Sequence, residues 1–428
     1  MRFSKICIVG MGYVGLTLSV VLAEKGYKVH GMEINKDVAA QLNRGKPHFH
    51  ENRLDVLLKK HLNNNLTISD DAPDDYEVFI ICVGTPLDKG TKKPILDYIM
   101  RSAEATAKHL SDGSLVILRS TVPVGITRNV VKPILETAGK KFYLAFCPER
   151  TAEGNALREL RELPQVIGGL DQDSVDLAVD LFRKVTPTTI EVSSLEAAEM
   201  VKLLNNTYRD LTFAYANEVA RICEHAGLSA LETIRAANLG YFRSDIPMPG
   251  FVGGACLEKD PYILAEYSGK RGYDPKLVRQ AREINEALPG HIADTVSRML
   301  SENNVTRAKV FISGFAFKGR PETDDLRGSL TIPLANELQR NHSVFAHDFV
   351  VKPEMLELAG YKACSIDDGF RDADCVIIAN NHNSYQKLNF GKLLPTMKRP
   401  ALLYDVWRIF EKDEIAQDGV IYGGVGIG

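Results

Sequence analysis

From residue 1 to about residue 190, short apolar runs alternate with longer segments in which apolar residues recur at helical spacing. Such runs are typical of buried strands, and strands that alternate with helices indicate a parallel, doubly wound sheet. We therefore predict an α/β domain over residues 1–192. The runs assigned to strands are KICIVG, KVHGMEI, VFIICVG, SLVILRS and FYLAFCP.

A different pattern begins at Ser193, where the apolar period becomes helical and remains so to Gly227. Ser194 offers a cap and Gly227 a stop, so the segment predicts one helix of about 30 residues. We expect this helix to form the spine of a central all-helical domain over residues 193–305. It could also serve as a dimer interface.

Alternation returns after Arg307, with the apolar runs AKVFISGFAF, SVFAHDF, DCVIIAN and ALLYDVW. The helical segment LTIPLANELQR separates the first two runs. This spacing predicts a smaller nucleotide-binding fold over residues 306–428. The expected α/β architecture is thus an N-terminal Rossmann domain, a central helical domain and a C-terminal Rossmann-like domain.

The composition is that of a globular protein with more than one core, with 428 residues of which 45% are hydrophobic and 25% charged. The formal net charge of −3 gives no electrostatic footprint for nucleic acid or an anionic membrane, so we expect a small-molecule partner. The apolar stretch Ile6–Ala23 is interrupted by ordered glycines and is followed by no small-residue cleavage site. We expect a soluble protein without a membrane span.

The seven cysteines are scattered, and none belongs to a C-x-x-C pair, which argues against a disulfide framework or a structural zinc site. The ten histidines are also dispersed, so no metal site is predicted. This usage is typical of a reducing cytosol, and a cytoplasmic location is expected. The cysteines are Cys7, Cys82, Cys147, Cys223, Cys256, Cys364 and Cys375.

The turn after the first apolar run reads VGMGYVG, a G-x-G-x-x-G pattern between a predicted strand and a predicted helix. Gly10 permits the tight turn, Gly12 lets the backbone approach a pyrophosphate, and Gly15 lets helix and strand pack closely. The positive end of the helix then faces the phosphates. Tyr13 and Val14 lie between these glycines and are predicted to contact the same cofactor.

Glu33 ends the second predicted strand, about 20 residues further on, where a carboxylate accepts hydrogen bonds from the adenosine ribose and repels a 2′-phosphate. NAD is therefore expected rather than NADP, although Lys36 follows closely. The alternative is a structural turn with a solvent-exposed Glu33. Thr85 in VGTP and Thr121 in STVPVG follow later strands, where they could contact cofactor or substrate or only end a turn.

The segment FVGGACLEKDPYIL, residues 251–264, places Cys256 between a glycine bend and a charged pair. Gly253 and Gly254 would leave the sulfur accessible, and a helix start with Lys259 nearby would favour the thiolate. A lone cysteine is more often an inert core residue. From these residues alone, nucleophile and inert core are equally supported, and a metal ligand is less so.

An NAD-binding fold gives a reactive cysteine a task that ordinary alcohol dehydrogenation lacks. A thiolate can add to an aldehyde, and the thiohemiacetal can lose hydride to give a thioester that water hydrolyses to an acid. This combination predicts a four-electron oxidation in which Cys256 holds the intermediate.

Several motifs occur in order along the whole chain, and the series is far more specific than any one of them. They are GMGYVG, VGTPLD, STVPVG, CPER, EAAEMVKLLNN, YANE, GGACLEKD and GFAFKGRPETDDLRGS. With this series the chain resembles the UDP-glucose/GDP-mannose dehydrogenase family. The resemblance implies an NAD-dependent oxidation of a nucleotide sugar at C6, from alcohol to uronic acid, with two NAD. Phe251 stands where a glycine is common, and LEKD replaces PKD, which puts the shape of the cysteine loop in question.

The resemblance also implies roles for individual residues, with Cys256 as the covalent nucleophile. Lys202 and Asn206 lie four residues apart and share one face of the predicted long helix. A cation at Lys202 suits both hydride transfers, because negative charge develops on oxygen. The implied roles are water and alkoxide stabilisation for Lys202 and Asp260, water positioning for Thr121 and Glu149, oxyanion donation for Asn206, and contact with thiol, sugar and cofactor for Lys259.

Further residues are expected to contact the substrate. Lys318 and Arg327 resemble residues that bind the nucleotide diphosphate, and surface ion pairs are the alternative for both. Long central helices in this family commonly pair into dimers, so a homodimer is expected. Arg243 resembles an arginine that reaches the active site of a neighbouring subunit in related enzymes. The other predicted substrate contacts are Glu149, Lys202, Asn206, Arg209, Phe251 and Gly253.

The Arg209–Asp210 pair and the segment CPERTAEGNALRELRELPQVIGG resemble members that act on UDP-N-acetylglucosamine or UDP-N-acetylmannosamine. A UDP-N-acetylhexosamine 6-dehydrogenase for polysaccharide or glycan synthesis is therefore the first expectation. UDP-glucose is the second candidate substrate and GDP-mannose the third. A non-catalytic nucleotide-sugar sensor is the alternative of a different class, and the intact set of Cys256, Lys202 and Asp260 argues against it.

Overall fold

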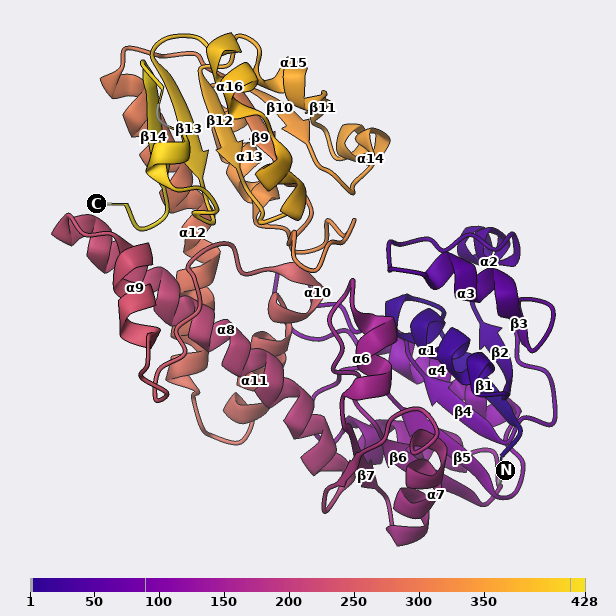
Figure 1. Cartoon of the computed structure of the whole chain (residues 1–428). Coiled ribbons are helices and arrows are strands. Elements are labelled where there is room, and N and C mark those ends of the chain that lie inside the picture. Colours follow the sequence, from indigo (N-terminus) through magenta and orange to yellow (C-terminus); the bar gives the residue numbers. More distant parts are fainter. Residues whose placement is uncertain (1–2, 89, 416, 428) are drawn as a thin grey trace. The chain divides into compact units, whose positions relative to one another are not determined.

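The computed structural model describes residues 3–88, 90–415 and 417–427 (Figure 1). The chain forms two compact units, and each is made of two segments. The first unit contains the residues up to Asn205 together with Tyr262–Asp274. The second contains Asn206–Pro261 and the residues from Pro275 onward.

The first unit is built on an eight-stranded sheet in the order β3-β2-β1-β4-β5-β6-β7-β8. Neighbouring strands are parallel, as predicted, except that β7 runs antiparallel to β6. The strands are β1 Lys5–Val9, β2 Lys28–Met32, β3 Leu66–Ser69, β4 Val78–Ile81, β5 Ser114–Leu118, β6 Phe142–Phe146, β7 Gln165–Gly169 and β8 Thr189–Glu191.

Helices cover both faces of this sheet, which explains why β1 is apolar from Ile6 to Val9. Successive side chains of a strand point to opposite faces. Ile6 and Ile8 accordingly pack in one core with α1 and α7, whereas Cys7 and Val9 pack in another with α4. The helices are α1 Tyr13–Glu24, α2 Lys36–Asn43, α3 Leu54–His61, α4 Asp97–Lys108, α5 Lys132–Glu136 (preceded by a π-helical turn, Thr127–Val131), α6 Ala156–Glu162 and α7 Gln172–Phe182.

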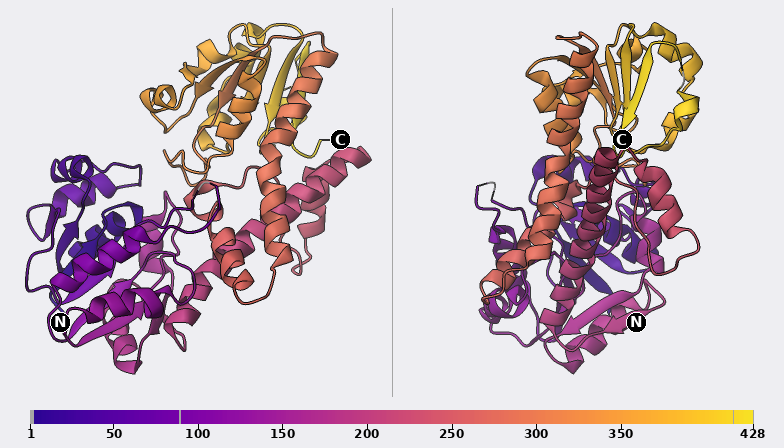
Figure 2. Two further views of the ribbon diagram at one scale, coloured as in Figure 1. Left: turned by 180° about the vertical axis from the view of Figure 1, so that it is seen from behind. Right: turned by 90° about the vertical axis from the view of Figure 1, so that its left-hand side faces the viewer.

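The long helix predicted from Ser193 to Gly227 is α8, Leu195–Ala226, and the Ser194 side chain accepts a bond from the Ala197 backbone as expected of a cap. In the second unit α8 lies beside α12, Lys276–Glu302 (Figure 2). Helices α9 Ala230–Asn238 and α10 Gly254–Leu257 also belong to the second unit, whereas most of α11 Asp260–Gly269 belongs to the first.

The second unit also contains a parallel six-stranded sheet in the order β11-β10-β9-β12-β13-β14. Leu288, Ile292 and Val296 of α12 pack in one core with Val310 of β9, while Phe311 packs on the opposite face of the sheet. The strands are β9 Lys309–Ser313, β10 Ser343–His347, β11 Lys362–Ala363, β12 Cys375–Ile378, β13 Ala401–Asp405 and β14 Val420–Gly424; the α-helices are α13 Thr331–Gln339, α14 Pro353–Leu358, α15 Ile366–Phe370 and α16 Phe390–Leu393. Three short 3-10 helices are Asn383–Lys387, Leu394–Thr396 and Lys412–Glu414.

Two kinds of feature are absent from the residues that the structure describes. Within those residues, no helix is both long and apolar enough to span a bilayer. The same residues contain no group of three or more His, Cys, Asp or Glu side chains placed to hold a metal ion.

Candidate active site

The glycine-rich turn after β1 lines a cavity of about 320 Å³ at the carboxyl ends of β1, β2 and β4. Gly10 has φ +92°, and a Cβ on Gly15 would lie 1.9 Å from the Gly10 carbonyl oxygen. Nothing lies within 4 Å of a Cβ position on Gly12, so its backbone is open to a ligand. These are the three properties that a pyrophosphate-binding turn requires.

Glu33 stands at the rim of this cavity, where its carboxylate accepts bonds from the backbone N–H of Met11 (3.0 Å) and of Asn35 (2.8 Å). These bonds fix the side chain at the end of β2, in the position that an adenosine ribose requires. The side chain of Ile34 is 70% exposed and offers an apolar surface beside it. Glu33 and the glycine turn therefore fit NAD.

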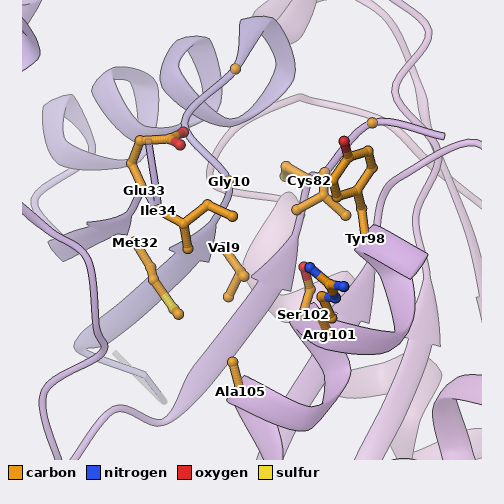
Figure 3. Close-up of a pocket in the computed structure, with 13 residues that line it drawn as sticks. Val9, Gly10, Met32, Glu33, Ile34, Cys82, Tyr98, Arg101, Ser102 and Ala105 are labelled. Atoms are coloured by element: carbon orange, nitrogen blue, oxygen red, sulfur yellow. The ribbon is translucent and has the colours of Figure 1, made fainter. Parts of the chain in front are cut away.

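The opposite wall comes from α4, where Tyr98, Arg101, Ser102 and Ala105 share one helical face (Figure 3). The sequence did not identify these residues as cofactor contacts. Their spacing of three, four and seven residues is the one signal that could have found them.

Two threonines predicted to contact ligand lie in the first unit. Thr85 is buried, and its hydroxyl has no hydrogen-bond partner within the protein, as expected of a group kept for a ligand. Thr121 is partly exposed, after β5.

The Tyr13 hydroxyl is engaged with Glu51 and with the backbone N–H of Gly154, so this side chain anchors the turn to the segment before α6.

Glu149 is buried after β6, and both of its carboxylate oxygens are engaged. One accepts from the Arg119 guanidinium at 2.6 Å, and the other accepts from the backbone N–H groups of Arg150 (2.7 Å) and Thr151 (2.8 Å). Burial alone would raise the pKa of Glu149, but Arg119, the Thr151 N–H and Lys202 together lower it. A carboxylate held in this way supplies a fixed negative charge and is a poor proton acceptor.

In the second unit, α10 carries Cys256, whose side chain is exposed. Four residues later, the Asp260 carboxylate is fully buried and accepts bonds from Asn206 (2.5 Å) and Lys259 (2.7 Å). Asn206 lies on α8, so the helix and the cysteine segment are joined at this carboxylate. Two predicted catalytic side chains, Asn206 and Asp260, thus form one hydrogen-bonded group with Lys259, the predicted contact for thiol, sugar and cofactor.

The glycines before Cys256 are required by a close backbone approach. A Cβ on Gly253 would lie 2.0 Å from the Gly328 carbonyl oxygen, and the Gly254 N–H donates to that oxygen at 3.0 Å. Gly254 has φ +91° and lies against the Phe317 ring. The cysteine segment is therefore packed onto the turn that contains Arg327 and Gly328.

The remaining predicted substrate residues occupy different environments. Phe251 is buried in the core with α12. Arg327 forms the surface ion pair that was its alternative role, with Asp325 at 2.6 Å. Lys318 lies over the Phe317 ring, 5.2 Å from its centroid. Arg209 is exposed on α8, and Arg243 is exposed and lies over the rings of Tyr241 and Phe242.

A second cavity, of about 480 Å³, lies in the second unit and was not predicted from the sequence. Trp407 and Arg408 line it from the segment after β13, together with Arg235 and Arg320. The Nε and Nη1 atoms of Arg408 are buried and have no hydrogen-bond partner in the protein. A guanidinium with free donors at a cavity wall fits an anionic ligand such as a phosphate.

Comparison with known proteins places the whole chain in one family. Residues 4–186 match the NAD binding domain of the UDP-glucose/GDP-mannose dehydrogenase family, residues 196–287 its central domain and residues 311–412 its UDP binding domain. A UDP-N-acetyl-D-mannosamine dehydrogenase of Methanococcus maripaludis is 32% identical over 95% of this chain and 93% of its own length.

Solved structures give the same result at the level of the fold. A UDP-D-ManNAc dehydrogenase from Pyrococcus horikoshii superposes with a TM-score of 0.89 at 32% identity, covering 99% of both chains. A UDP-glucose dehydrogenase from Pyrobaculum islandicum superposes with a TM-score of 0.88 at 26% identity, covering 100% of this chain and 98% of its own. The chain therefore belongs to the UDP-glucose/GDP-mannose dehydrogenase family and is an NAD-dependent nucleotide-sugar dehydrogenase.

Proposed function

We propose that the protein oxidises the C6 hydroxyl of a UDP-N-acetylhexosamine to a carboxylate, with two NAD consumed per sugar, to supply precursors for polysaccharide or glycan synthesis. The observation that carries the covalent part is the exposed thiol of Cys256, four residues before Asp260, which is bonded to Asn206 and Lys259. The other cysteines are buried or half-buried, and burial raises the pKa of Cys82 and Cys147 to about 12. Such thiols are inert as nucleophiles, which leaves Cys256.

In the proposed reaction, two NAD molecules, held in turn by the glycine turn and Glu33, would supply the hydride acceptor for the two oxidation steps. The first step converts the C6 alcohol to an aldehyde, and the Cys256 thiolate then adds to the aldehyde carbon. Loss of the second hydride gives a thioester, which water cleaves to release the acid and the thiol. Lys202 and Asn206 stabilise the oxyanions, Asp260 holds the attacking water, and Thr121 and Glu149 help to position it.

The UDP portion of the substrate needs cations for its diphosphate. Arg408 supports this role through its free, buried N–H groups, and Lys318 and Arg327 remain proposed diphosphate contacts. Trp407, beside Arg408 in the same cavity, offers an aromatic face for the nucleotide. Arg408→Lys is expected to raise the KM for the UDP-sugar at least tenfold, because a bidentate donor becomes a point charge.

The N-acetylated sugar is supported by relatives named UDP-N-acetyl-D-mannosamine dehydrogenase and by the Arg209–Asp210 pair in the sequence. UDP-glucose is the second candidate, since a UDP-glucose dehydrogenase shares the fold, and GDP-mannose is the third. Steady-state NADH formation with each purified nucleotide sugar distinguishes them. Turnover of UDP-glucose that is faster by orders of magnitude would contradict the proposed substrate.

Replacement of the nucleophile distinguishes the enzyme from a nucleotide-sugar sensor. Cys256→Ala is expected to abolish uronate formation while NAD binding remains, and the wild-type enzyme is expected to yield two NADH per sugar. Unchanged uronate formation by the variant would eliminate the covalent mechanism. One NADH per sugar would indicate a two-electron dehydrogenase.

We also propose that the protein acts as a homodimer in the cytoplasm. On α8, Tyr208, Tyr215 and Ile222 are exposed and follow one another at seven-residue spacing. Phe242, 93% exposed, stands next to Arg243 in a separate loop. Large exposed apolar side chains in a regular stripe support an interface with a second copy of the chain.

A further inference from the structure

Four polar side chains form a buried network between α8 and α12. Asp210 and Asn217 come from α8, and Arg282 and Asn285 come from α12; each is at most 2% exposed. They are distinct from the hydrogen-bonded group of Asn206, Asp260 and Lys259. We call these four residues the Arg282 network.

The network binds the backbone of the cysteine loop, residues 250–257. The Arg282 guanidinium donates to the carbonyl oxygens of Val252 (3.0 Å) and Leu257 (2.9 Å). The Asn217 amide donates to the Gly250 carbonyl (3.1 Å) and accepts from the Gly250 N–H (2.8 Å). Three carbonyls and one N–H of an eight-residue loop are therefore satisfied by two side chains.

These bonds lie on both sides of the nucleophile in the sequence. Val252 precedes Cys256 by four residues and Leu257 follows it directly. The Gly254 N–H, between them, is bonded to Gly328. The backbone around Cys256 is thus held at several points, while its own side chain is exposed.

The network is completed by bonds among its own members. The Asp210 carboxylate accepts hydrogen bonds from Arg282 (2.8 Å) and from Asn285 (2.9 Å). The side-chain amide oxygen of Asn285 accepts one from the Asn217 amide (2.9 Å). A buried ion pair of this kind contributes little net stability compared with apolar residues of the same volume. Apolar residues could not donate to the loop carbonyls, so the value of the pair lies in the geometry that it imposes.

We propose that Arg282 and Asn217 are positioning residues for Cys256, which fix the backbone of the cysteine loop so that the thiol faces the sugar C6 at attack distance. This inference rests on the proposed covalent role of Cys256. An error of about 1 Å in the placement of a nucleophile costs about 100-fold in rate. Asp210 and Asn285 act through the other two, by orienting the guanidinium and the amide.

The inference is tested with Asn217→Ala and Arg282→Lys. Asn217→Ala leaves no unpaired charge. Arg282→Lys keeps the charge beside Asp210 but loses the guanidinium that donates to two loop carbonyl oxygens at once. For both we expect kcat to fall about 10- to 100-fold, with the KM for the sugar changed less than threefold. The rate of alkylation of Cys256 by iodoacetamide, followed by mass spectrometry without substrate, should change at least fivefold.

His291→Ala is the matched control, because His291 makes a separate bond between the same two helices, to Glu224 at 2.8 Å. It should lower the melting temperature and leave kcat and the alkylation rate within twofold of the wild type. The inference is overturned if Asn217→Ala and Arg282→Lys behave like this control.

Cys256→Ala separates the inference from the proposed function. If it abolishes uronate formation and the network variants match His291→Ala, only the inference fails. If it leaves uronate formation intact, the covalent mechanism fails, and a fivefold change in alkylation would still support the positioning of the thiol.

Discussion

Glu199 carries a buried carboxyl group that holds the loop after β5. It accepts bonds from the Gly125 N–H (2.5 Å), the Thr127 N–H (2.9 Å) and the Thr127 hydroxyl (2.5 Å). Burial raises its pKa from 4.5 to about 7, although these bonds oppose the rise. The same loop contains Thr121, a proposed contact in the active site. The protonation state of Glu199 therefore affects the loop that positions Thr121.

This shift predicts a pH dependence of stability. Between pH 4.5 and 7 the folded state binds a proton at Glu199 that the unfolded state does not, so the free energy of unfolding falls as pH rises. The effect is of order 3 kcal/mol, and Glu199→Gln should remove it from melting curves recorded across that range. Glu196→Gln is the comparison: it removes a neighbouring charge that helps to raise the pKa of Glu199, so it should only reduce the slope, and the opposite slope from Glu196 itself, whose pKa the bond from Arg128 lowers, lies below pH 4.5. Identical pH slopes in all three proteins would contradict the assignment.

Glu33 predicts the choice of cofactor. Glu33→Gln keeps an acceptor for the Met11 N–H but removes the charge that repels a 2′-phosphate. We expect the KM for NAD to rise about tenfold and activity with NADP to increase, because a hydrogen bond to a charged group contributes about 1.5–3 kcal/mol. Steady-state kinetics with both cofactors measures this. Lys36→Ala should leave both values nearly unchanged, since Lys36 lies outside the cavity.

At the scale of elements, the turn between β1 and α1 contains glycines with two different roles, one in packing and one in cofactor binding. Gly15→Ala places a Cβ 1.9 Å from a backbone oxygen and should lower the free energy of unfolding by about 2–3 kcal/mol. Gly12→Ala meets no protein atom within 4 Å, so it should fold normally and lose NAD affinity. Denaturant unfolding and NAD titration of both variants check this. Equal stability losses would mean that Gly12 serves packing rather than the pyrophosphate.

What the sequence predicts well is local. The glycine turn, the Ser194 cap and the length of α8 follow from neighbouring residues, and the structure confirms them. The antiparallel pairing of β7 does not follow, because strand direction depends on how the chain returns to the sheet.

The candidate site shows the same limit. Cys256, Asp260 and Asn206 were found through motifs, and the structure joins Asn206 to Asp260. Arg282 was missed because its partner Asp210 lies 72 positions away, and nothing local marks an arginine on an amphipathic helix as buried. Arg408 was missed for a similar reason, since its free donors are visible only when the cavity is formed.

At the scale of the whole molecule, the proposed dimer has a direct test. Replacing Tyr215 and Ile222 together by Glu puts two charges into the exposed stripe of α8, and we expect the wild-type dimer to become a monomer in sedimentation velocity. If Arg243 reaches the active site of the second subunit, uronate formation should fall when the dimer is lost. Leu358→Glu, at a side chain 82% exposed on α14, should leave the dimer intact. A wild-type protein that sediments as a fully active monomer would contradict the proposed dimer.

The order of segments along the chain has a consequence for biosynthesis. The first unit needs Tyr262–Asp274, where Tyr262 lies under the Lys92 ammonium, and these residues follow a long stretch that belongs to the second unit. A ribosome that adds about 5–20 residues per second requires several seconds to travel from Asn205 to Asp274. During that interval the nascent NAD-binding unit lacks one of its own segments, and it becomes complete only after the cysteine loop has been synthesised.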